Sequence, residues 1–70
     1  MIESVELKSV LQILKKLPAK YEEVINMRYI DGLSPQKIAE VLGESENAVS
    51  VRINRAIKKI QELLHIQLND

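Results

Sequence analysis

Residues 32–64 read GLSPQKIAEVLGESENAVSVRINRAIKKIQELL, and this stretch contains the signals for two helices separated by a tight turn. Ser34 can cap the first helix, Gly43 permits the positive φ that a tight turn requires, and Ser45 can cap the second helix. Small Ala39 suits the point where the two helices cross. The apolar stripe of the second helix comprises Val49, Ile53, Ala56, Ile60 and Leu63. This pattern predicts a helix-turn-helix unit, whose second helix commonly lies in the major groove of DNA.

The chain before this stretch predicts two more helices. An amphipathic stripe with helical spacing is formed by Leu7, Val10, Leu11 and Leu14. Pro18 disfavours a helical residue before it and suits the first turn of a new helix. Tyr21 and Tyr29 fall on the apolar stripe of that helix, so we expect both in the core rather than as platforms for stacking bases. The four predicted helices cover about residues 3–16, 19–30, 34–42 and 46–66.

Length and composition favour one all-α domain spanning residues 1–70, a four-helix domain with a C-terminal helix-turn-helix and a long last helix. The chain has no Cys and one His, so neither disulfides nor a metal site built from thiolates and imidazoles is expected. No run approaches the ~18 apolar residues of a membrane span, and the N-terminus lacks the layout of a signal peptide. We therefore expect a cytoplasmic protein with no membrane partner and no cofactor.

The sequence also argues against an enzyme. It contains no nucleophile–base pair, carboxylate dyad or phosphate-binding loop, and 70 residues of helix leave little room for a pocket. No small-molecule substrate is expected.

Charge is balanced overall but unevenly distributed. The formal net charge is zero, whereas a strongly basic chain would indicate nucleic acid directly. Residues 49–59 nevertheless contain four basic residues and no acidic one. This local excess is consistent with a helix that approaches phosphates.

The outward face of the last helix follows from about 100° of rotation per residue. Opposite the apolar stripe, or on its flank, lie Asn47, Ser50, Val51, Asn54, Arg55 and Lys58. Asn can pair with adenine, Arg with guanine, and an aliphatic side chain can touch a thymine methyl group, so this face is a candidate for reading bases. The start of the preceding helix offers exposed amides together with Ser34, Gln36 and Lys37, a candidate site for phosphate.

Two residues of the last helix have competing interpretations. Arg52 lies near the core boundary, and a structural ion pair with a carboxylate of the second or third helix is favoured over a base contact. Val51 is an exposed β-branched residue with no evident packing role. It is a candidate for a thymine methyl contact, with a protein interface or no role as the alternatives.

Several short pieces of the sequence, between Leu17 and Ala56, resemble region 4 of bacterial RNA polymerase sigma factors, most closely the extracytoplasmic-function group. The matching pieces are Leu17-Pro18, Glu23-Val24-Ile25, Met27-Arg28-Tyr29, Gly32-Leu33-Ser34, Lys37-Ile38-Ala39-Glu40, Leu42-Gly43, Ala48-Val49 and Arg52-Ile53-Asn54-Arg55-Ala56. The resemblance implies a domain whose last helix recognises the minus-35 element of double-stranded promoter DNA. It also implies a surface for the β-subunit flap of the RNA polymerase core and, in many members, a contact with an anti-sigma factor.

The chain departs from this family pattern on the outward face of the last helix. Asn47-Ala48 stands where a Gly-Thr pair is usual, and Ser50-Val51 stands where a basic residue followed by Ser is usual. The face is thus less cationic and more apolar than in typical members, so the promoter sequence does not carry over from the family. Sigma factors also need a region 2 to open promoter DNA, and nothing in these residues supplies it. We therefore expect either an excised C-terminal domain of a sigma factor or a stand-alone protein that has the same fold.

Two other functions remain as alternatives. One is a LuxR-type effector or a small sigma-like accessory regulator, for which a dimer and a palindromic DNA site are expected. The other is a protein-interaction module that has lost DNA binding, suggested by the zero net charge, Val51 and the apolar Ile66 and Leu68.

Overall fold

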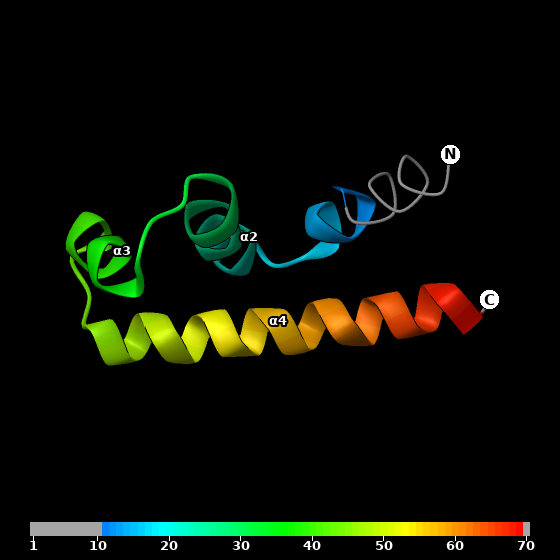
Figure 1. Ribbon diagram of the computed structural model, residues 1–70. Helices are drawn as coiled ribbons and strands as arrows, with labels where there is room; N and C mark the ends of the chain where they lie inside the picture. The colour runs from blue at the N-terminus through cyan, green and yellow to red at the C-terminus, as the bar shows by residue number, and fades with distance from the viewer. Residues whose placement is uncertain (1–10, 70) are drawn as a thin grey trace.

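The structure, a computed structural model, describes the backbone of residues 11–69 and the side chains of residues 11–65 (Figure 1). In this part of the chain four helical stretches follow one another without a strand, which confirms the all-α prediction. They are residues 11–16, α2 (Ala19–Ile25) continued by the π-helix η1 (Asn26–Ile30), α3 (Pro35–Leu42) and α4 (Glu46–Asn69). The predicted start of the first helix, with Leu7 and Val10, and the side chains of Ile66 and Leu68 lie outside the described residues.

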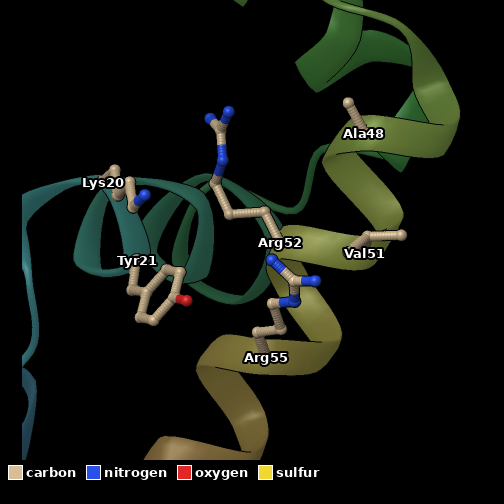
Figure 2. Close-up of a pocket in the computed structure, with 6 residues that line it drawn as sticks. All are labelled: Lys20, Tyr21, Ala48, Val51, Arg52 and Arg55. Carbon is tan, nitrogen blue, oxygen red and sulfur yellow. The ribbon is translucent and has the colours of Figure 1, made fainter.

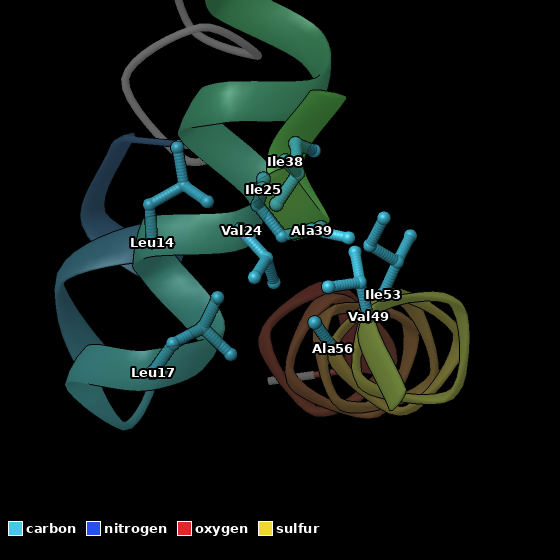
Figure 3. Close-up of a cluster of buried hydrophobic side chains, with 9 residues drawn as sticks. All are labelled: Leu14, Leu17, Val24, Ile25, Ile38, Ala39, Val49, Ile53 and Ala56. Carbon is cyan, nitrogen blue, oxygen red and sulfur yellow. The ribbon is translucent and has the colours of Figure 1, made fainter. Parts of the chain in front are cut away.

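Helix α4 forms one long rod, and the other helices lie along one side of it (Figure 1). Figure 3 looks along this rod and shows aliphatic side chains of all four stretches meeting between them. Among the described residues, the central cluster of buried side chains is aliphatic: Leu14, Leu17, Val24, Ile25, Ile38, Ala39, Val49, Ile53 and Ala56. Because this core is made by helix packing alone, the stability of the domain depends on how well these few side chains fill it.

The buried ridge of α4 agrees with the predicted stripe. Val49, Ile53 and Ala56 are buried, and farther along the helix Ile60 and Leu63 are partly buried against the same core. Ile57 also packs there, although the predicted stripe did not include it. The helix runs to Asn69, three residues beyond the predicted end at about residue 66, because neither Gly nor Pro interrupts the chain after Gly43.

The first helix is rotated relative to the prediction. Leu11, which was expected on the buried stripe, is 48% exposed, whereas Ile13, which lies off that stripe, is 1% exposed. Leu14 and Leu17 join the core as well. Leu14 and Leu17 follow Ile13 by one and four residues. The three side chains therefore form a second apolar stripe that overlaps the first. Tertiary packing selects between two such stripes.

The prediction that Tyr29 lies in the core was wrong, since its side chain is 59% exposed. The cause is the π-helix η1, in which the Asp31 N–H donates to the Asn26 carbonyl, five residues back. The wider turn changes the angular register at the end of the helix, so a period of 3.6 residues no longer locates the inner face. Tyr21, which precedes the π-helix, packs partly buried against the core as expected.

The predicted caps and turns of the helix-turn-helix unit are confirmed. The Lys37 N–H donates to the Ser34 hydroxyl over 3.1 Å, and the Ala48 N–H donates to the Ser45 hydroxyl over 3.0 Å. Gly43, between the two helices, has a φ of 68°, a left-handed conformation that glycine adopts without strain. These local bonds fix where α4 begins, and so which of its residues face outward.

Candidate nucleic-acid interface

The predicted base-reading residues of α4 share one outward stripe. Each lies three or four residues from another member of the set along an uninterrupted helix, which places them on one broad face. Five are exposed and Ser50 is half-buried; the set is Asn47, Ser50, Val51, Asn54, Arg55 and Lys58. This outward stripe therefore combines hydrogen-bonding side chains, one aliphatic side chain and two cations on an accessible surface.

Arg52 fulfils the predicted structural role with a different partner. Its guanidinium donates to the carboxylate of Glu44, which lies in the turn between α3 and α4 rather than on the second or third helix. The pair spans eight residues and ties the turn to the second turn of α4. Both side chains are only partly exposed, so this ion pair is better shielded from solvent than the two i,i+3 pairs at Lys37–Glu40 and Lys59–Glu62.

The predicted phosphate site at the start of α3 is weaker than expected. Pro35 has no N–H, and the Lys37 N–H is already bonded to the Ser34 hydroxyl. Of the first three helical positions, only Gln36 keeps an N–H available to an anion. The Lys37 ammonium lies 3.5 Å from the Glu40 carboxylate, which partly compensates its charge. Ser34, Gln36 and Lys37 are all exposed, so they remain accessible to a phosphate.

A cationic groove lies beside the outward stripe. Its volume is about 300 Å³, and it is lined by Lys20, Tyr21, Ala48, Val51, Arg52 and Arg55. Figure 2 shows Lys20 and Tyr21 on α2 across the opening from Arg52 and Arg55 on α4. Sequence reasoning did not select Lys20 or Tyr21, because no local pattern shows that the start of α2 packs beside α4.

An apolar groove lies on the opposite side of α4. It has a volume of about 340 Å³ and is lined by Leu11, Leu14, Ile25, Tyr29, Ile30, Ile57, Ile60 and Gln61. At about 100° per residue, its Ile57 and Gln61 fall on one flank of the buried ridge, and the four α4 residues of the cationic groove fall on the other. Leu11, Tyr29 and Ile30 are exposed although apolar, so this groove leaves a hydrophobic surface uncovered in the described chain.

Together, the capped turn, the buried ridge and the accessible polar stripe define a helix-turn-helix protein in which α4 is the second helix of the unit. The chain belongs to the sigma-70 region 4 family, whose sequence profile matches residues 7–60.

Curated relatives agree with this assignment. The chain is 41% identical over 68 residues to the extracytoplasmic-function RNA polymerase sigma factor SigW of Bacillus subtilis, covering 96% of this chain and 34% of that protein. It is 39% identical over 57 residues to the RNA polymerase sigma factor SigV of the same organism, covering 81% of this chain and 32% of that protein. A sigma factor of Streptomyces coelicolor, BldN, is 29% identical over 63 residues, covering 90% of this chain and 24% of that protein. The chain thus spans about a third or less of each of these relatives, and no solved structure matches it significantly.

Neither a membrane-spanning helix nor a metal-binding cluster is found among the residues that the structure describes. None of their helices is both long enough and apolar enough to cross a bilayer. They also contain no group of three or more His, Cys, Asp or Glu side chains placed to hold a metal ion.

Proposed function

We propose that this chain is the promoter-recognition domain of a sigma factor and that α4 binds the minus-35 element in the major groove. The observation that carries the proposal is the accessible stripe on α4, held by the Ser45 cap at the start of the helix in a chain of the region 4 family. The partners are double-stranded promoter DNA and the RNA polymerase core, which places the protein in the cytoplasm. The activity is binding rather than catalysis.

The chemistry of the stripe suggests how bases are read. Asn47 and Asn54 can each donate to and accept from an adenine edge, and Arg55 can donate two hydrogen bonds to guanine. Val51 is 39% exposed and can contact a thymine methyl group. Lys58, one turn beyond Asn54, is placed to contact a phosphate. Because Ser50 and Val51 replace the more polar pair usual in the family, the preferred sequence should differ from that of typical members.

Selection of bound sequences from random duplex DNA tests this function. We expect a short, asymmetric preferred site, because one recognition helix reads one segment of the groove. We also expect the binding constant to fall steeply as the salt concentration rises. The slope of log K against log [salt] should be roughly −0.9 for each phosphate contacted. A palindromic site bound by a dimer would favour the LuxR-type alternative. An absence of sequence preference even at low salt would contradict promoter recognition.

We further propose that the apolar groove holds the β-subunit flap of the polymerase and that an anti-sigma factor competes for it. Two properties support this assignment. The groove is lined by apolar side chains apart from Gln61, as a protein partner's hydrophobic segment requires. It also lies across α4 from the cationic groove, so DNA and polymerase can be bound at the same time.

The change Ile30→Gln tests the flap assignment. Ile30 is 68% exposed, so the substitution should leave the fold intact while placing an amide where a partner's apolar side chain would pack. We expect affinity for an isolated flap domain, measured by calorimetry, to fall about tenfold, the effect of ~1.4 kcal/mol. Val41→Gln, another exposed aliphatic position but outside the groove, is the matched control and should change nothing. Equal losses in both variants, or a parallel loss of DNA binding, would contradict the assignment.

A further inference from the structure

We propose that the cationic groove between α2 and α4 holds a backbone phosphate of the bound duplex, so that Lys20 and Tyr21 anchor DNA from outside the helix-turn-helix unit. This inference rests on the proposed DNA-binding function and adds a second contact surface to it. The ligand is a phosphodiester group of double-stranded DNA.

The groove carries an excess of positive charge. Three of its six lining residues are cations, Lys20, Arg52 and Arg55, and none is acidic. Arg52 is partly compensated by Glu44, but neither Lys20 nor Arg55 forms an ion pair with any described residue. Two uncompensated cations facing one opening favour an anion there, since a bound phosphate would offset their mutual repulsion.

Three kinds of hydrogen-bond donor line the groove: guanidinium, ammonium and hydroxyl. A guanidinium can hold two oxygens of one phosphate, an ammonium adds a compact charge, and a tyrosine hydroxyl can donate one hydrogen bond. Tyr21 is half-buried against the core, and the Lys20 ammonium lies 5.7 Å from the centre of its ring. The ring is therefore held by packing, and the cation–π contact favours a position of the ammonium close to it. Figure 2 shows the Tyr21 ring across the groove from Arg55.

The groove adjoins the outward stripe of α4. Val51 and Arg55 belong to both, so a duplex contacting the stripe brings one of its strands past the groove. Ala48 and Val51 contribute small apolar surface to the lining, which lets the longer donors reach a phosphate between the two helices. Because α2 already packs against α4 through the core, the site is formed before DNA arrives and little ordering is required on binding.

The charge-removing change Lys20→Gln tests this inference in the 70-residue chain. Lys20 is exposed, so the fold should be retained, as circular dichroism can verify. On the duplex preferred by the wild type, we expect an affinity loss of about three- to tenfold and a salt dependence shallower by about 1 in log–log slope, with base preference unchanged. Lys15→Gln, an exposed lysine outside the groove, is the matched control and should have a much smaller effect.

A second measurement locates the contact on the DNA. Single phosphates of the duplex are replaced in turn by neutral methylphosphonate linkages, and binding is measured for the wild type, Lys20→Gln and Tyr21→Phe. We expect one phosphate whose neutralisation weakens wild-type binding but has little further effect on Lys20→Gln. Tyr21→Phe, which removes only a hydroxyl, should weaken binding to the unmodified duplex and reduce the effect of that same phosphate.

The outcomes separate this inference from the function on which it rests. If the wild type selects no sequence at all, promoter recognition fails. If the wild type binds a defined site but Lys20→Gln behaves as Lys15→Gln does, and no phosphate is coupled to Lys20, the groove is not a phosphate site and promoter recognition by α4 still stands.

Discussion

The change Ile38→Ala is expected to leave a large fraction of the chain unfolded at room temperature. The Ile38 side chain on α3 is fully buried in the core that joins α3 to α4. Removing most of a buried isoleucine costs about 2–5 kcal/mol, through lost burial and the cavity that remains. A single core in a domain of this size supplies roughly 3–5 kcal/mol in total, so the loss is comparable to the whole free energy of unfolding.

Urea denaturation followed by circular dichroism at 222 nm measures this effect. Val41→Ala is the matched control, since Val41 lies on the same helix but is exposed, and its free energy of unfolding should change by no more than about 0.5 kcal/mol. A cost below about 1 kcal/mol for Ile38→Ala would show that α3 contributes little to the core. Similar costs for both variants would contradict the assignment of the buried face of α3.

The double change Arg55→Ala and Lys58→Ala is expected to abolish most DNA binding without unfolding the domain. Both side chains are exposed on the stripe, and neither forms an ion pair with a described residue, so their loss removes no core contact. An Arg that contacts a base edge contributes about 1–3 kcal/mol, and each 1.4 kcal/mol is tenfold in affinity. With a phosphate contact from Lys58 added, the combined loss should be on the order of 100-fold.

Fluorescence anisotropy with the selected duplex measures the affinity, and thermal unfolding checks the fold. Lys59→Ala is the control on the same helix, because Lys59 is exposed but lies off the stripe and is paired with Glu62. It should bind DNA nearly as the wild type does. If the double variant melts early yet retains its residual affinity, the orientation assigned to α4 is wrong.

The two grooves lie on opposite sides of one helix, α4. In our proposals, the flank of α4 that carries Arg52 and Arg55 binds an anionic partner, and the opposite flank, with Ile57 and Gln61, binds an apolar one. The buried ridge between them fixes both orientations, because any rotation of α4 would expose Val49 to solvent. A core residue such as Val49 would therefore influence the proposed DNA binding by fixing the orientation of α4, without contacting the DNA itself.

Local signals predicted much of this fold correctly. The caps at Ser34 and Ser45, the left-handed Gly43 and the buried ridge of α4 all depend on interactions within a few residues, which the sequence displays directly. Charge distribution and spacing likewise selected the exposed stripe, since position on a long, unbroken helix follows from residue number alone. Whether those residues bind DNA stays a prediction.

The errors arose where a local rule was insufficient. Tyr29 was misplaced because a π-helical turn changed the period, and Leu11 because two overlapping stripes competed for the same core. Arg52 was predicted to form a structural ion pair, but its partner Glu44 lies in a turn whose approach to α4 depends on the packed structure.

The sequence by itself determined the helices, their capped ends and the outward face of the last helix, because each of these follows from bonds and periodicity within one element. Only the tertiary structure decided that Lys20 and Tyr21 stand across from Arg55, and that Leu11, Tyr29 and Ile30 share one uncovered groove. Both grooves form between elements distant in the chain, where position is set by how the aliphatic core packs rather than by any neighbouring residue.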